Sequence, residues 1–259
     1  MAVAETITST VKQRLDQALE QENPRPLLLS GLERDAKSLF GTSDASFGYL
    51  ILGMLDAINN RKNDFNKHFD FISAPEVLND ASFYRLNGLN RMGYFEDAIV
   101  YLKEMFKASK NTNDPLLLRA LAQLGMLYGF MEQPGLIIER LNKMTSHNPN
   151  QNVGLISLLQ LLKNTKIEEA VLVSVILAGK ELLKEKGFQI PTYAFHYSVE
   201  LDNVIELRML CFCNNLAKLV EADEALSALL IDMEDSVDSN LINFNISCRP
   251  YNSSHGIGC

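Results

Sequence analysis

The segment 80–109, DASFYRLNGLNRMGYFEDAIVYLKEMFKAS, constrains the fold of this chain more than any other stretch. Apolar residues recur at helical spacing as far as Met92, Gly93 interrupts the pattern, and a second helical pattern opens at 94–98. Glycine adopts a left-handed backbone cheaply, so it can end the first helix, and the small Ala98 lets two helices approach closely. The segment therefore predicts an antiparallel helix pair with a tight glycine turn.

This segment resembles a tetratricopeptide repeat, in which a turn glycine is followed two residues later by an aromatic residue and five residues later by alanine. Those positions are Gly93, Phe95 and Ala98 here. The next segment, 118–150, carries other parts of the pattern, namely 124–125 (Leu-Gly) with Tyr128 three residues on, and Pro-Asn at its end, although it lacks the turn glycine and the central alanine. The resemblance implies first helices that line a concave surface.

When these segments are aligned, the repeat pattern starts at five positions: Ser46, Asn79, Leu118, Gln151 and Glu206. Successive starts are 33, 39, 33 and 55 residues apart. A repeat of about 34 residues with small insertions accounts for the first three steps. We therefore expect an all-α fold, a right-handed superhelical solenoid of antiparallel helix pairs. The alternative is an irregular helical bundle without true repeats.

The expected organisation is one continuous domain with four parts. Two amphipathic helices, Val11–Glu20 and Leu27–Phe40, lie on either side of a proline-containing break and predict an N-terminal cap over 1–45. Helix-pair repeats follow over 46–186. A C-terminal module of strand, helix pair and strand covers 187–248, and a loose tail covers 249–259.

Two segments near the C-terminus read as strands within this helical chain. Thr192–Val199 is rich in aromatic residues and lacks helical periodicity, and Asn240–Cys248 alternates strictly between apolar and other residues. We expect the two to pair as a small two-stranded element around helices at 204–219 and 222–235, because an isolated strand leaves backbone groups unpaired. The alternative is that one strand adds to a sheet edge of a partner or of a second copy in a homodimer. The candidate strand-pairing residues are Tyr193, Phe195, Tyr197, Ile242, Phe244 and Ile246.

The composition limits the classes of partner that we expect and the cellular compartment in which we expect the protein. The formal net charge is −8, and Lys and Arg are scattered through the 259 residues, which argues against nucleic acid. The first 21 residues lack a signal-peptide pattern, and the longest apolar runs are too short for membrane insertion, so we expect a cytoplasmic protein. The four cysteines, Cys211, Cys213, Cys248 and Cys259, are expected to be buried free thiols and not metal ligands.

Catalytic patterns are missing from the sequence. It contains no Gly-rich phosphate loop, Gly-x-Ser-x-Gly elbow or His-Glu-x-x-His helix. The histidines, His68, His147, His196 and His255, are widely separated and are interpreted as surface or hydrogen-bonded residues. We therefore expect no enzyme activity, no metal and no cofactor.

The resemblance implies a groove that holds a peptide or helix of another protein. The family's carboxylate clamp needs lysines where this chain has Phe83 and Ala122, which disfavours a chaperone-tail receptor. A mixture of aromatic, Met, amide and Arg side chains suits a peptide with apolar anchors. We predict a scaffold, adaptor or chaperone-like binder, with a ligand-responsive sensor and an enzyme with an unrecognised site as alternatives. The expected groove residues are Phe83, Tyr84, Asn87, Arg91, Arg119, Gln123, Met126, Phe130, Leu159 and Lys163.

Overall fold

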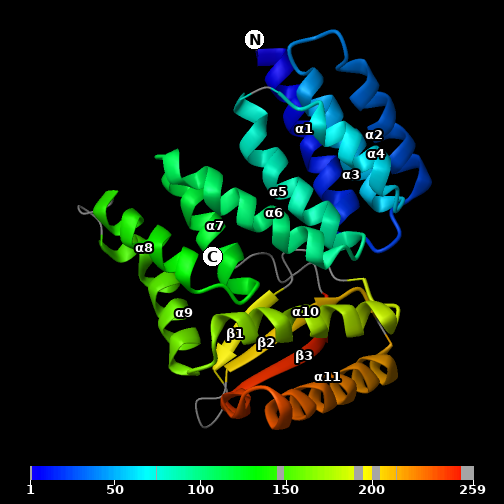
Figure 1. Cartoon of the computed structure of the whole chain (residues 1–259). Coiled ribbons are helices and arrows are strands. Elements are labelled where there is room, and N and C mark those ends of the chain that lie inside the picture. Colours follow the sequence, from blue (N-terminus) through cyan, green and yellow to red (C-terminus); the bar gives the residue numbers. More distant parts are fainter. Residues whose placement is uncertain are drawn as a thin grey trace. The chain divides into compact units, whose positions relative to one another are not determined.

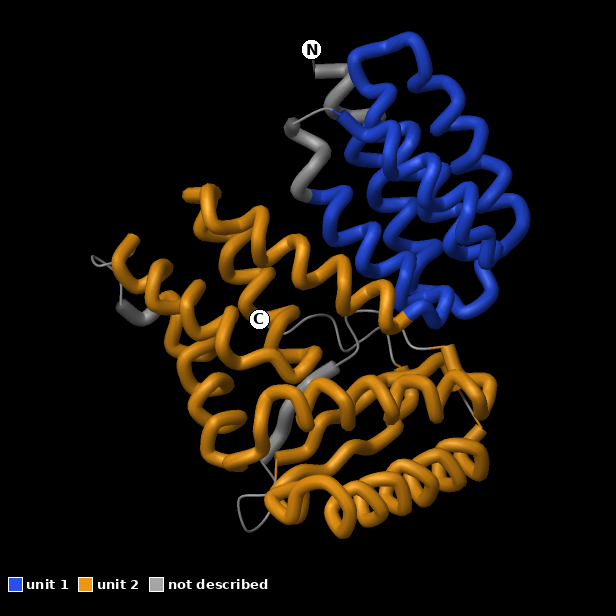
Figure 2. The backbone as a smooth tube through the Cα atoms, in the orientation of Figure 1, with its two compact units in different colours: residues 1–94, 253–259 blue, residues 95–252 orange. Residues whose placement is uncertain are grey.

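The computed structural model describes residues 2–73, 75–144, 149–189, 195–199, 205–213 and 215–251. The chain divides into two compact units (Figure 2). Unit 1 comprises 1–94 with 253–259, and unit 2 comprises 95–252. The division falls at the Gly93 turn.

Unit 1 is built from five helices: α1 (Ala2–Leu19), α2 (Pro26–Ser38), α3 (Ala45–Ile58), α4 (Lys62–Asp70) and α5 (Pro75–Arg91) (Figure 1). The two helices expected near the N-terminus are thus present as parts of α1 and α2. Pro26 opens α2, where its missing N–H costs nothing. The most apolar of the five, α3, contacts all four others and forms the centre of the unit.

Two phenylalanines of α4 fill the space between helices of unit 1. Phe65 is fully buried, and the Phe69 ring lies 4.7 Å from it, centroid to centroid. Phe65 faces Gly88 of α5 so closely that a Cβ at Gly88 would lie 2.2 Å from the ring atom Cε2. The absence of a side chain at Gly88 is therefore a packing requirement.

Unit 2 begins with five α-helices: α6 (Phe95–Ala108), α7 (Pro115–Leu127), α8 (Glu132–Met144), α9 (Val153–Asn164) and α10 (Glu169–Glu185), with short 3-10 turns η1 (Ser109–Asn111) and η2 (Pro149–Asn152). Asp114 caps α7, because its carboxylate accepts from the N–H groups of Leu116 and Leu117, and Pro115 occupies the first helical position. Helices α7 and α8 pack on each other, as the helix-pair prediction for 118–150 requires.

A small sheet lies near the C-terminus, as expected, and it has three strands in the order β1-β2-β3. These are β1 (Phe195–Val199), β2 (Ile205–Cys211) and β3 (Phe244–Pro250). β1 and β2 are antiparallel, whereas β2 and β3 are parallel and are joined by α11 (Leu216–Ser236) in a β-α-β connection.

The structure corrects two expectations about this module. The two expected strands do not pair directly, because β2 lies between them. The helix expected at 204–219 is wrong over 205–211, since these residues alternate in a strand and bury Leu207 and Met209 completely. The second expected helix is the middle of a single longer helix, α11.

The C-terminal strand also begins later than expected. Residues 239–243 form a 3-10 turn, η4 (Ser239–Asn243), in which Ile242 is 64% exposed. The predicted apolar face is present from Phe244 onward, because Phe244, Ile246 and Cys248 are all buried, but Ser247 is buried as well, so exposure does not alternate strictly. Their face of the sheet packs on helices, since Gly179 of α10 lies against Met209, Ile246 and the α11 residue Leu226. In Figure 1 both helices run beside the strands.

Candidate functional site

Two of the expected groove residues in unit 1 join α5 to α1. The Tyr84 hydroxyl donates to the Asp16 carboxylate at 2.6 Å. The Arg91 guanidinium donates to the carbonyl oxygens of Leu19 at 3.0 Å and Gln21 at 2.8 Å, just beyond the C-terminal end of α1. Burial lowers the pKa of Arg91 to about 10, so it stays charged at neutral pH and complements that helix end. These two side chains therefore stabilise the unit.

The remaining expected groove residues differ widely in exposure. On α5, Phe83 is half-buried and Asn87 is buried. In unit 2, Gln123 and Lys163 are exposed, Leu159 is buried, and Arg119 donates to the side chains of Gln151 and Asn152 at the approach to α9.

Met126 and Phe130 cannot act as groove residues, and that expectation is wrong for both. Met126 is fully buried and Phe130 is 6% exposed with its ring against Phe106. The apolar residues on one face of α7, and those that follow this helix, pack inside unit 2. A continuous groove from α5 to α9 would involve both units and stays a prediction.

Four of the six expected strand-pairing residues lie on the two edge strands, β1 and β3. Tyr193 lies outside the described residues. Phe195 and Tyr197 in β1 are the register partners of Met209 and Leu207. Phe244 and Ile246 are buried in β3, and Ile242 precedes the strand.

A cavity of about 380 Å³ in unit 1 brings together residues that the sequence analysis did not connect. Its walls come from α2, α3, α4 and the turn between α3 and α4. Asn60 in that turn has φ 56°, a left-handed conformation that asparagine tolerates. This turn returns Arg61 to the end of α3, where its N–H donates to the carbonyl oxygen of Asp56 at 2.8 Å. The charged and titratable lining residues are Glu33, Lys37, Asp56, Arg61 and His68.

Asp56 organises the polar end of this cavity. Its side chain is 3% exposed, with one oxygen 2.5 Å from the Arg61 guanidinium and the other 2.7 Å from Nδ1 of His68. A buried carboxylate needs such partners, and it fixes the orientation of the imidazole in return. Within the described part of the chain, the other ring nitrogen of His68, Nε2, has no hydrogen-bond partner. The Arg61 side chain is 56% exposed.

An aromatic cluster of Phe40, Tyr49 and Phe71 adjoins the cavity through His68. The Tyr49 ring lies 4.8 Å from Phe40, 5.1 Å from Phe71 and 6.2 Å from the His68 ring, between centroids. Phe71 is 60% exposed and Phe40 is 37% exposed. The sequence gives no sign of this cluster, because its members come from three different helix ends.

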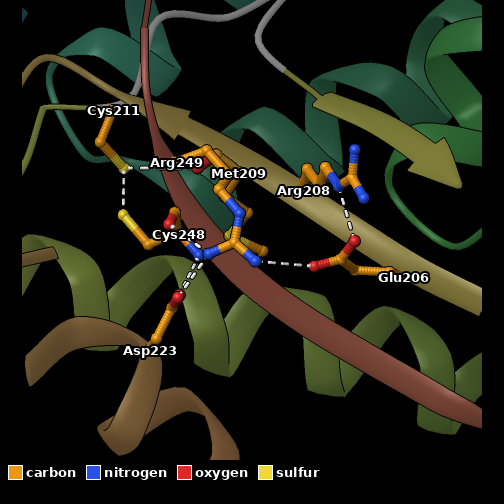
Figure 3. Close-up of polar contacts among 7 residues, drawn as sticks. All are labelled: Glu206, Arg208, Met209, Cys211, Asp223, Cys248 and Arg249. Atoms are coloured by element: carbon orange, nitrogen blue, oxygen red, sulfur yellow. Dashed lines mark hydrogen bonds and ion pairs between the residues drawn. The ribbon is translucent and has the colours of Figure 1, made fainter. Parts of the chain in front are cut away.

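A second polar network lies in unit 2 between β2, β3 and α11 (Figure 3). The Glu206 side chain is 4% exposed and contacts Arg208 at 2.6 Å and Arg249 at 3.2 Å. Asp223 of α11 lies 2.5 Å from Arg249 and accepts from the Cys248 N–H, also at 2.5 Å. Asp223 thereby satisfies a backbone donor on the outer edge of β3.

Two searches of the described residues concern metal sites and membrane spans. The described side chains include no group of three His, Cys, Asp or Glu residues that could hold a metal ion. Across the same residues, no helix is long and apolar enough to span a membrane. No family model, curated protein or solved structure matches this chain.

Proposed function

We propose that this protein is a non-catalytic scaffold that holds a peptide or helix of a partner protein. Its anchor site in this proposal is the cavity between α2, α3 and α4 together with the aromatic cluster. The observation that carries the proposal is an exposed Phe71 in an aromatic cluster that reaches the cavity lining through Tyr49 and His68, in a cavity that is also lined by a half-exposed arginine. Aromatic and arginine side chains dominate the binding energy of protein interfaces.

The site is organised before any ligand binds. Tyr49 is held between Phe40 and Phe71, so the aromatic surface loses little conformational entropy on binding. The cavity lies at the small end of the range for ligand pockets, which runs from about 300 to 1,000 Å³. It can take one or two side chains of an inserted segment.

The charges at the cavity favour an acidic group on the partner. Each acid in the lining already has basic partners, since Asp56 contacts Arg61 and His68, and Glu33 lies 2.6 Å from Lys37. The remaining N–H groups of Arg61, and His68 Nε2 when protonated, are hydrogen-bond donors. An apolar side chain next to a carboxylate therefore complements the aromatic cluster and the donors together.

A tetratricopeptide-like superhelix and a cytoplasmic location are part of the same proposal. Gly93 has φ 73°, and Ala98 is fully buried, which supports the repeat-type turn. A homodimer formed by strand addition is the alternative use of the sheet edges, and sedimentation of the full chain distinguishes a monomer from a dimer.

A displayed peptide library selected on the full chain tests the binding function. We expect enriched peptides with an apolar residue near Asp or Glu, and about tenfold weaker binding by the Phe71→Ser variant. Leu136→Ser is the matched control, because Leu136 is an exposed apolar residue (53%) on α8. Failure to enrich any peptide, or equal binding by the Phe71→Ser variant, would refute the proposed site.

The Asp56 and His68 pair supports one second candidate, a hydrolase. A histidine oriented by a buried carboxylate can act as a general base toward water. In this alternative the full chain would hydrolyse chromogenic esters, and His68→Asn would abolish turnover while keeping a donor to Asp56. Turnover that persists in this variant would exclude His68 as the base.

A further inference from the structure

Two thiols meet between neighbouring strands of the C-terminal sheet. The Sγ atoms of Cys211 in β2 and Cys248 in β3 are 3.2 Å apart (Figure 3). Both side chains are almost fully buried, with 0% and 1% exposure. This inference is independent of the proposed binding site in unit 1.

We propose that Cys211 and Cys248 are a site of oxidative modification, at which a small hydroperoxide converts the two thiols into a disulfide that joins β2 to β3. In the first step a thiolate sulfur attacks the peroxide, the O–O bond breaks, and a sulfenic acid and an alcohol form. In the second step the other sulfur displaces the hydroxyl as water, and the S–S bond forms. Two thiols and one hydroperoxide give one disulfide, one alcohol and one water.

The positions of the two sulfurs favour this product. An S–S bond of about 2 Å requires a further approach of about 1.2 Å from the observed separation. Both side chains are on the same face of the sheet, although the register pairs Cys248 with Met209, so the cross-link runs diagonally. Cys211 is the last residue of β2, and its carbonyl oxygen accepts from the Tyr251 N–H at 2.7 Å, so the backbone holds the two strands together on either side of the sulfurs.

The surroundings distinguish the two sulfurs from one another. The hydrogen bond from Cys248 and burial both raise the pKa of the Cys211 thiol. Burial also restricts the oxidant to a small, uncharged molecule such as a hydroperoxide, and excludes a bulky disulfide.

Cys213 provides an internal comparison. It is half-buried, and its Sγ lies 3.4 Å from the N–H of Asn215 at the start of α11. It is more accessible than the pair. Accessibility alone would direct oxidation to Cys213, whereas proximity directs the disulfide to Cys211 and Cys248.

The test treats the full, reduced chain with hydrogen peroxide, blocks the remaining thiols by alkylation, and measures intact mass and a non-reducing peptide map. We expect a loss of two hydrogens, a linked peptide pair that contains Cys211 and Cys248, and reversal by dithiothreitol. Cys213→Ser should retain this link, and Cys211→Ala and Cys248→Ala should each lose it. The oxidised protein should also unfold several degrees higher, because the link closes a loop in the unfolded chain.

Several results would overturn the proposal. These are a map that shows no disulfide, a link that uses Cys213 in place of either partner, or loss of the link in the Cys213→Ser variant. Because the map is made on the unmodified sequence, the result does not depend on whether the alanine variants fold.

Discussion

The packing of Gly88 against Phe65 leads to a quantitative prediction for Gly88→Ala. An added methyl group in a packed core costs about 1–3 kcal/mol, and replacing glycine inside a helix returns about 1 kcal/mol. The new Cβ would lie 2.2 Å from a fully buried ring that has no open space to enter, so the upper end of the cost applies. We expect a net loss of about 2 kcal/mol in the free energy of unfolding.

Thermal unfolding followed by circular dichroism measures this effect. For a unit of this size the loss corresponds to a midpoint lower by roughly 10 °C. Gly31→Ala is the control, because the atoms nearest to a Cβ there belong to the guanidinium end of Arg14, which can move. Adding Phe65→Leu to Gly88→Ala should recover part of the loss through a coupling of about 1 kcal/mol. A Gly88→Ala variant as stable as the parent would refute this account of how α5 packs on α4.

Three further changes test other contacts. Tyr84→Phe removes the hydrogen bond to Asp16 and should lower the unfolding free energy by about 1 kcal/mol in a denaturant titration; no change would mean that the bond is not formed. Burial lowers the pKa of Lys180 in the folded protein well below its ordinary value. Between the lowered pKa and the ordinary pKa, the unfolded chain binds more protons than the folded chain, so the free energy of unfolding should rise with pH. The Lys180→Met variant should lose this rise when denaturation midpoints are measured at several pH values. A rise as steep as that of the parent protein would show that Lys180 does not cause it. Glu206→Gln should cost about 1–2 kcal/mol, because Arg208 and Arg249 lose a buried carboxylate but are 32% and 43% exposed and Arg249 keeps Asp223, whereas exposed Glu224→Gln should change the denaturation midpoint little.

The helices before and after Gly93 were predictable because their signals are local. The Gly93 turn and the small Ala98 act within a few residues, and the structure has the expected left-handed glycine and a buried alanine. The strand alternation after Phe244 was visible for the same reason. β2 was missed because a seven-residue apolar stretch with Glu206 and Arg208 fits a helical pattern as well as a strand.

The functional residues were harder to predict because they depend on tertiary contacts. Helical periodicity marks the polar face of α5, but it does not reveal that α1 ends opposite Tyr84 and Arg91. Asp56 and His68 are twelve residues apart on different helices, and only the packing of α4 on α3 brings them together. No spacing rule for a single helix joins such a pair.

The parallel pairing of β2 with β3 has a consequence during synthesis. The ribosome completes β2 before residues 212–243 and then β3 are made, which takes several seconds at about 5–20 residues per second. Throughout that interval one edge of β2 lacks its native neighbour, and its apolar face lacks α11. In this state the unpaired backbone groups of β2 can form hydrogen bonds with strands of other chains, which leads to aggregation. Slow translation of α11 should therefore increase the demand for chaperones during production of this protein.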